Sequence, residues 1–490
     1  MYRVQHRGCK TSPGFDQERE RESERERERE REMSDDQQVK SSSQDYEVLG
    51  DGSSETPPPS MLPIWSVVKK VKTKATLTSS VFNLANTILG SGVIAMPYAC
   101  KKSGWVMFTV MLMVVAIASD YAVKLLFLAV ETMTTKRPRD IDPEHVSYSA
   151  LGRVMKNKRL EMIGSWSVTL QQIGCCIAYV VVIGDIFEPL AKHFIYDDKA
   201  TRSIVQILTL VLVIFPLTLI RKFDTLKFTS FVAIACIMAF VVLVIVYGLY
   251  GWIEGPGGEI REGEMKTWPS GVDMLTAFPI MSFAYLCHQN TFPIYRELSE
   301  PSPERMNYVS HFSIAICTFV YLGSGIFGYS IAKHDTESDL FNNFDVTGGA
   351  INTAVDIVSV GFGVAIVFSY PIVVWEARRN LQHLLFGQKE FAFSRYVMLN
   401  ASIVIITGVV GIVASGIEKV LGLVGSTCSP MMIYVLPPLL YFESKKFLSA
   451  DELKNTGSTD LGAKALLLFG IVLIPLCVTL WILGLANVLS

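Results

Sequence analysis

The chain has 490 residues, of which 50% are hydrophobic and 18% charged, with a mean hydropathy of +0.35 and a formal net charge of -2. This balance excludes an ordinary soluble protein, because a chain of this size could not keep so much apolar surface away from water. The charge also excludes the positive field that a nucleic-acid-binding protein needs, so we expect no nucleic-acid partner. We therefore predict a polytopic membrane protein embedded in lipid.

The first part of the chain differs in composition from the rest. Residues 1–67 are polar and contain a run of alternating Glu and Arg from Glu18 to Glu32, which cannot bury a core. We predict a disordered cytosolic tail over 1–67 and a transmembrane transporter domain over 68–490. Within the tail, Tyr46 to Leu49 matches a tyrosine-based sorting signal. Such a signal would bind a sorting adaptor and direct the protein to endosomes or lysosomes.

Apolar runs follow one another from residue 75 onward. About eleven of them are long enough to cross a hydrocarbon core of roughly 30 Å, so we predict an all-α membrane fold. The runs cover residues 75–100, 105–130, 160–187, 203–220, 228–253, 271–295, 307–332, 349–377, 396–414, 420–442 and 465–488.

The distribution of basic residues predicts the orientation in the membrane. Lys and Arg gather in the loops after the second, fourth, eighth and tenth spans, as at Arg137, Lys222 and Arg378. The loops on the other side hold far fewer basic residues and include Asp335 and Asp339. Because basic loops stay in the cytosol, we expect a cytosolic N-terminus and a C-terminus on the opposite side.

The first span is interrupted halfway by Gly90, Ser91 and Gly92. In hydrocarbon an unpaired backbone group costs several kcal/mol, so a break at this depth indicates a place where the freed groups face protein, water or a ligand. The N–H groups that begin the second half-helix could hold a carboxylate. The alternative is a small-residue face that lets two helices approach closely.

The sixth span contains a second interruption, between Pro279 and Pro293. Its unwound part, about Ser282 to Tyr285, would offer carbonyl oxygens to a substrate ammonium group, and no Asp or Glu lies near either break in the sequence. The alternative is a structural helix kinked by proline. The two broken spans lie five positions apart in the order of spans, which predicts a five-plus-five inverted repeat with broken first and sixth helices.

Four motifs together resemble the amino acid/auxin permease family, and within it the sodium-coupled neutral amino acid transporters and their vacuolar relatives. The motifs are Ser80 to Gly92, Phe283 to His288 followed by Pro293 to Tyr295, Ser369 to Pro371, and Gly425 to Thr427 with Pro437. The resemblance covers nearly everything from Thr76 to the end. It implies an eleven-span inverted repeat and secondary active transport of amino acids.

The breaks and the resemblance together give a set of candidate site residues. Those expected to contact the substrate are Gly90, Ser91, Gly92, Val93, Ser282, Phe283, Ala284 and Tyr179. Tyr179 in the third span would close over the substrate, although core packing explains it equally well.

The coupling ion has two candidate sites. The resemblance implies a sodium site at Asn86 and Ser369, whose oxygen ligands suit Na⁺, although both side chains could instead bond neighbouring helices. Proton coupling would need a titratable group, for which His288 is the candidate, although a structural role for it is the commoner case.

We predict a secondary transporter of neutral amino acids that works by alternating access and is coupled to Na⁺ or H⁺. We expect no other cofactor and no enzyme activity, since no nucleophile and base pair or metal-ligand set stands out. The alternative is an amino-acid sensor that signals through its cytosolic tail. The outward loops carry neither a cysteine pair nor an N-glycan acceptor, which favours an endosomal, lysosomal or vacuolar membrane over the plasma membrane.

Overall fold

A computed structural model describes most of the chain beyond the tail. The chain divides into two units, Met1–Leu62 and Pro63–Ser490, and the fold below is that of the second. The predicted tail over 1–67 and the Tyr46 to Leu49 signal lie outside the described residues. These are 75–141, 146–192, 200–220, 227–254, 264–269, 271–344, 350–387, 392–414, 416–454 and 456–485.

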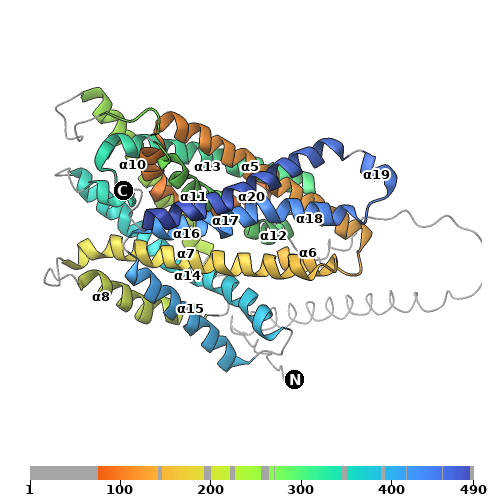
Figure 1. The fold of residues 1–490 in the computed structure, drawn as a ribbon. Coiled ribbons are helices and arrows are strands. Elements are labelled where there is room, and N and C mark those ends of the chain that lie inside the picture. Colours follow the sequence, from red (N-terminus) through yellow and green to blue (C-terminus); the bar gives the residue numbers. More distant parts are fainter. Residues whose placement is uncertain are drawn as a thin grey trace, which may run out of the picture. The chain divides into compact units, whose positions relative to one another are not determined.

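The described residues are almost entirely helical, as predicted (Figure 1). The one β pairing among them is an isolated bridge between Ala75 and Leu298. In chain order the helical segments are α3 (Leu77–Ile88), η1 (Ser91–Ala95), α4 (Met96–Ser103), α5 (Trp105–Lys136), α6 (Tyr148–Val154), α7 (Lys158–Lys192), α8 (Thr201–Leu208), η3 (Thr209–Ile214), α9 (Phe215–Thr218), α10 (Lys227–Glu254), α11 (Asp273–Ala284), α12 (His288–Glu297), α13 (Pro303–Ala332), η5 (Lys333–Asp335), η6 (Leu340–Phe344), α14 (Ala350–Phe386), α15 (Phe393–Val413), α16 (Ile417–Ser426), α17 (Cys428–Pro430), η7 (Met431–Val435), α18 (Leu436–Lys445), α19 (Ala450–Lys454) and α20 (Gly457–Leu485).

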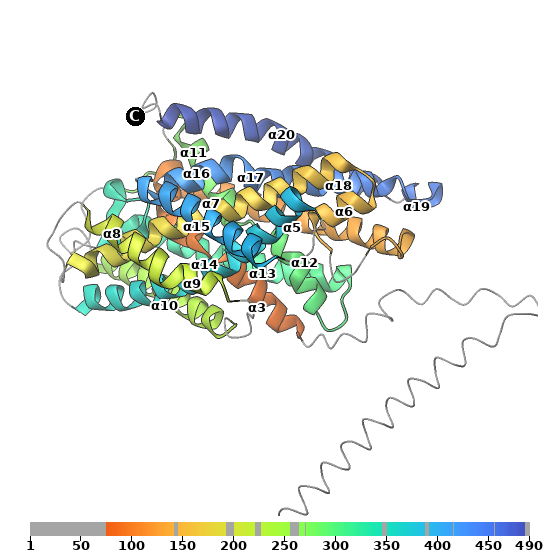
Figure 2. The same cartoon turned by 90° about the horizontal axis from the view of Figure 1, so that it is seen from below.

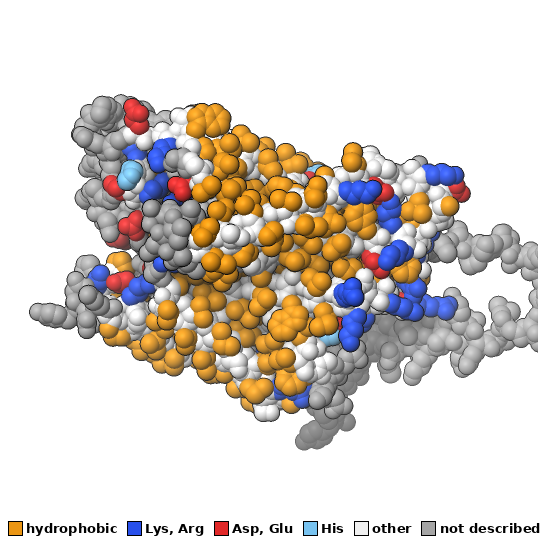
Figure 3. Space-filling view, viewed as in Figure 1, with side chains coloured by type: hydrophobic (Ala, Val, Ile, Leu, Met, Phe, Trp, Pro, Cys, Tyr) orange, Lys and Arg blue, Asp and Glu red, His pale blue; other side chains and the backbone are white. Residues whose placement is uncertain are grey.

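Eight helices among the described residues are long and apolar enough to cross a membrane. A ninth results if α3 and the η1–α4 segment, which meet at a bend of 51°, count as one broken span. Helical segments also occupy the two other predicted spans, as α10 and as the pair α11 and α12. The total of eleven remains a prediction. Figure 3 shows a broad hydrophobic face with charged side chains gathered at its two ends, which suits a bilayer.

The helix contacts place the two broken spans inside the bundle. Helix α13 packs against α3, α4 and α5, while α11 packs against α4 and α16. Helix α7 lies along α14, and theirs is the most extensive helix contact among the described residues. Helix α20 lies at the edge of the bundle in Figure 2, with large apolar side chains such as Leu468 and Val472 exposed. The breaks are therefore shielded from lipid by the helices around them.

Two spans that the sequence suggested to be continuous contain irregular turns. The fourth span includes the π-helix η3, just before Pro216, and the tenth contains the π-helix η7, just before Pro437 and Pro438. Proline has no N–H to donate to the carbonyl four residues earlier, so the preceding turn widens and finds other partners.

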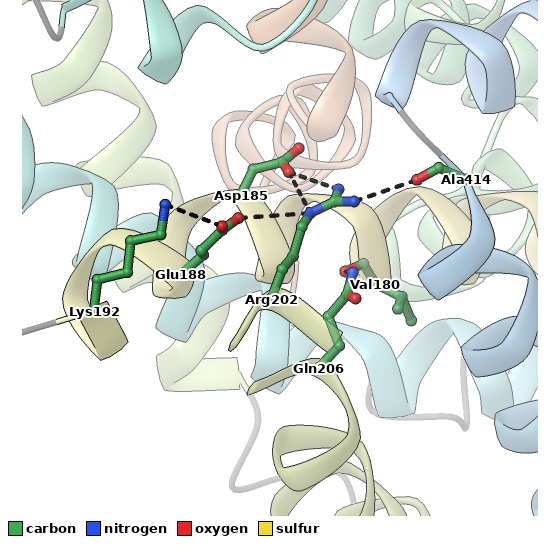
Figure 4. A network of polar contacts seen from close by, with 7 residues as sticks. All are labelled: Val180, Asp185, Glu188, Lys192, Arg202, Gln206 and Ala414. Carbon is green, nitrogen blue, oxygen red and sulfur yellow. Dashed lines mark hydrogen bonds and ion pairs between the residues drawn. The ribbon is translucent and has the colours of Figure 1, made fainter. Parts of the chain in front are cut away.

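A network of charged groups joins α7, α8 and the end of α15 (Figure 4). Arg202 donates to Asp185 Oδ1 at 2.6 and 3.0 Å and to the Ala414 carbonyl oxygen at 3.4 Å. The Asp185 side chain is 13% exposed, so this partner compensates a charge that is largely removed from water. Beside it, Gln206 Nε2 donates to the Val180 carbonyl oxygen at 2.9 Å. Asp185 thus has a structural partner at the end of its span.

Gly425 allows the closest approach between α16 and α11. A Cβ atom at this position would overlap with the carbonyl group of Pro279. Backbone cannot move aside as a flexible side chain can, so only glycine fits here. This contact explains the glycine of the Gly425 to Thr427 motif by packing.

We predict that Gly425→Ala destabilises the protein by about 1–3 kcal/mol, because α16 must separate from α11. The matched control is Gly484→Ala in α20, where an added Cβ meets no atom within 4 Å. The midpoint of thermal unfolding of the purified protein in detergent measures both. Equal midpoints for the two variants would contradict the packing role of Gly425.

Candidate functional site

The first break lies between α3 and η1, as predicted. Helix α3 ends at Ile88, and Gly90 has a backbone conformation outside the helical region, with φ -93° and ψ -147°. The N–H of Val93 donates to the Gly90 carbonyl oxygen at 3.3 Å. The N–H groups of Ser91 and Gly92 precede this first bond of η1 and have no acceptor within the helix. They are therefore available to an anion.

The second break covers Tyr285 to Cys287, between α11 and α12. The predicted unwound part, Ser282 to Tyr285, is wrong for its first three residues, because α11 stays helical to Ala284. Pro279 and Pro293 lie inside the two half-helices, so the prolines flank the break and do not form it. Some of the carbonyl oxygens predicted to be free for a substrate already accept hydrogen bonds from the protein. Leu286 N–H donates to the Phe283 carbonyl oxygen at 3.1 Å, and Ser119 Oγ to that of Tyr285 at 3.1 Å.

Helix α13 supplies hydrogen-bond donors to the first broken span. Its donors stand at steps of four, four and three residues and therefore on one face of the helix. They are Ser313 Oγ to the Val81 oxygen at 2.9 Å, Cys317 Sγ to Ala85 at 3.6 Å, Tyr321 Oη to Ile88 at 2.6 Å, and Ser324 Oγ to Val93 at 3.0 Å. Sequence reasoning missed these residues, although polar side chains at this spacing within an apolar span are a readable signal.

Tyr321 connects the two breaks. Its hydroxyl lies 2.6 Å from the carbonyl oxygen of Ile88, at the end of α3, and 3.0 Å from that of Ala284, at the end of α11. The side chain is fully buried. The one proton of this hydroxyl is shared by two carbonyl acceptors, so a single side chain holds the ends of both half-helices at the point where their regular bonding stops.

The two breaks also touch through Gly92 and Ala284. A Cβ atom on Gly92 would stand 2.8 Å from Ala284 Cβ, so Gly92 serves close packing as well as any ligand. Gly90 differs, because its nearest neighbour would be the Tyr179 hydroxyl oxygen at 4.0 Å. Gly92 thus sets the distance between the breaks, and Gly90 leaves open space in front of Tyr179.

This open space is a cavity of about 100 Å³. Its described lining residues come from α3, η1, α7, the second break, α12 and α14. They are Thr87, Ile88, Gly90, Ser91, Gly92, Gln171, Gln172, Cys175, Tyr179, Phe283, Ala284, Leu286, Gln289, Asn290, Ile372, Val373 and Glu376.

Six of the predicted substrate-contacting residues line the cavity, and two are turned to other partners. Val93 is buried, with its carbonyl oxygen bonded to Ser324, and the Ser282 hydroxyl lies 3.1 Å from that of Tyr434. The contact of all eight residues with a substrate stays a prediction.

The cavity wall contains a carboxylate that lies far from both breaks in the sequence. Glu376 of α14 lies far from both breaks in sequence but shares the cavity with them. It accepts a hydrogen bond from Nε2 of Gln172, which lies on α7. The prediction that no Asp or Glu lies near the breaks is therefore correct for the sequence and wrong for the folded structure. Only the fold brings α14 to this position.

The predicted ion-coupling residues lie outside the described wall of this cavity. Asn86 is on α3, and Ser369 of α14 donates its hydroxyl to the Ala365 carbonyl oxygen at 2.8 Å. His288 begins α12 and is fully buried. Their roles toward Na⁺ or H⁺ stay predictions.

The chain matches a known protein family over most of its length. Residues 73–482 match the family model of the transmembrane amino acid transporter protein family. The chain belongs to this family. It is accordingly a membrane transport protein and not an enzyme.

Curated relatives agree with this assignment, and solved structures share the fold. The chain is 29% identical over 338 residues to amino acid transporter AVT6E of Arabidopsis thaliana, covering 67% of each chain. It is 26% identical over 413 residues to sodium-coupled neutral amino acid symporter 2 of Danio rerio, covering 79% of each. Crystal structures of two mutants of a manganese transporter from Eremococcus coleocola share the fold, with a TM-score of 0.52, 12% identity, and coverage of 90% of this chain and 92% of theirs.

We predict that Tyr321→Phe destabilises the protein by about 1–3 kcal/mol, because the Ile88 and Ala284 carbonyls lose a shared donor in a buried place. The control is Tyr308→Phe on the same helix, where the side chain is 47% exposed. Thermal unfolding in detergent gives the comparison. A Tyr321→Phe variant as stable as Tyr308→Phe would show that the hydroxyl does not stabilise the breaks.

Proposed function

We propose that this chain carries neutral amino acids across a membrane by alternating access, driven by a Na⁺ or H⁺ gradient. The observation that carries the proposal is the meeting of two helix breaks at one cavity, with Gly92 against Ala284. Broken helices at the midplane of a bundle offer backbone groups of both signs to a zwitterion. The substrate α-carboxylate would bind the N–H groups of Ser91 and Gly92.

The ammonium group of the substrate would bind carbonyl oxygens at the second break. The carbonyls of Phe283 and Ala284 already accept one hydrogen bond each, and a carbonyl oxygen has a second lone pair to offer. Tyr179 lies across the cavity, with its hydroxyl oxygen toward Gly90. These groups would hold the invariant part of an amino acid and leave its side chain toward α7 and α14.

A sodium ion at Asn86 and Ser369 is one proposal for the driving ion, and the name of the zebrafish relative supports it. A proton taken up at His288 is the other. Both family relatives are named as transporters, so we do not propose the sensor function.

The membrane and its orientation belong to the same proposal. The basic loops support a cytosolic N-terminus. The tail signal at Tyr46 to Leu49, read by a sorting adaptor, supports an endosomal, lysosomal or vacuolar membrane, with the plasma membrane as the alternative.

We predict that Gly92→Leu abolishes uptake of labelled neutral amino acids into proteoliposomes, because the larger side chain forces the two breaks apart. The protein should still insert, since the change lies between half-helices. Gly90→Ala is the matched variant: its Cβ has space, so we expect reduced but measurable uptake.

Uptake is measured with a Na⁺ gradient, a pH gradient, or neither, on the wild type, Asn86→Ala and His288→Gln. Dependence on Na⁺ that is lost in Asn86→Ala supports sodium coupling. A Gly92→Leu variant that transports normally would contradict the location of the site, and a wild type that never exchanges neutral amino acids would contradict the proposed function.

A further inference from the structure

Glu376 is a charged group in the wall of the cavity to which no role has yet been given. Among the described residues that line the cavity, it is the one acidic side chain, and no Lys, Arg or His accompanies it. Its partner is the neutral amide of Gln172, which donates to Oε2. The described wall of the cavity therefore offers this carboxyl group an amide partner and no opposite charge.

The groups that face Glu376 can be named from each side. On its own helix, Arg379 is one turn away, and Asn380 Nδ2 bonds the backbone oxygen of Glu376 at 3.2 Å. From α7 come Gln172, the Cys175 thiol and the Tyr179 hydroxyl. The described wall residues of α3, η1, α11 and α12 carry no titratable side chain. Among the described groups named here, Arg379 is the charged neighbour, and it lies on the same helix and outside the wall.

We propose that Glu376 is the group in this carrier that takes up the coupling proton. The inference rests on the proposed function and specifies that its driving ion is a proton. A proton from the outer solution would bind one carboxylate oxygen when the cavity is open to that side, turning the carboxylate into a neutral carboxylic acid. The same proton leaves when the cavity opens to the other side. No other bond forms or breaks.

The hydrogen-bond chemistry of Gln172 favours a proton over a metal cation at this position. An amide group offers both a donor and an acceptor, so after rotation it can accept from a carboxylic acid as well as donate to a carboxylate. The N–H that meets Oε2 carries a partial positive charge and would repel a sodium ion from the same oxygen. Glu376 can therefore alternate between two satisfied states with one partner.

The hydrogen bond between Gln172 and Glu376 also lies where a change of charge would affect the packing of helices around the breaks. It joins α7 to α14, the two helices with the most extensive contact, and α7 also contacts η1 at the first break. His288 has a weaker position, because it is fully buried and does not line the described cavity wall. A proton in cavity water would reach Glu376 first.

The test compares wild type, Glu376→Gln and Glu376→Asp in proteoliposomes, with uptake driven by a pH gradient and exchange of neutral amino acids measured without any gradient. We expect Glu376→Gln to lose stimulation by the pH gradient while exchange stays within about twofold of wild type, since an uncharged side chain can no longer carry the proton. Glu376→Asp should retain part of the stimulation. The control is Glu443→Gln, at the end of α18, where the carboxylate pairs with Lys446 at 2.8 Å.

A second variant keeps the proposal testable if Glu376→Gln does not fold. Gln172→Leu removes a hydrogen bond that is stronger to the charged carboxylate than to the neutral acid, so the outer pH at which uptake is half-maximal should rise by about one unit. An unchanged midpoint in this variant would overturn the proposal.

Two further outcomes would also overturn it: full pH-gradient stimulation in Glu376→Gln, and loss of exchange in that variant, which would assign Glu376 to the substrate. If wild type drives uptake with Na⁺ alone, this inference fails and the proposed function stands. If wild type shows no exchange, the proposed function itself fails.

Discussion

The structure depends on one constraint, the need to satisfy backbone groups where two helices stop inside a membrane. Each break frees carbonyl and N–H groups, and each group left unpaired at this depth would cost several kcal/mol. Helix α13 meets this need with a row of hydroxyl and thiol donors, and Tyr321 serves both breaks at once. The carbonyls are largely satisfied by the protein, which leaves the N–H groups of Ser91 and Gly92 as the open positions.

Close packing complements this hydrogen bonding. Gly92 against Ala284 and Gly425 against Pro279 bring α11 to the first break on one side and to α16 on the other. Gly90 does the opposite, because it leaves space in front of Tyr179. Two glycines two residues apart therefore have different tasks, one setting the distance between helices and the other forming the cavity.

Part of the polar lining of the cavity comes from helices that are intact. Gln171, Gln172 and Tyr179 of α7 and Glu376 of α14 face the breaks from the opposite wall. A rigid wall and a broken wall around one small cavity suit a carrier, since one side can hold fixed charges while the other changes conformation. In this arrangement the Glu376 carboxylate lies between the substrate-facing groups and the contact of α7 with α14.

The sequence by itself determined the membrane-spanning helical fold and the position of the first break, because hydropathy and glycine placement act locally along the chain. It placed the unwound part of the sixth span at Ser282 to Tyr285, whereas the break covers Tyr285 to Cys287. The breaks and the family resemblance together predicted six of the residues that line the cavity. The sequence did not reveal the π turns before Pro216 and Pro437, whose form depends on which partners replace the missing N–H groups. Only the tertiary structure decided that Tyr321 joins the breaks, that Val93 and Ser282 are not among the lining residues, and that Glu376 lies beside the cavity. The physical reason is that these relations depend on contacts between helices far apart in the chain, and the spacing of residues within one helix carries no information about its neighbours.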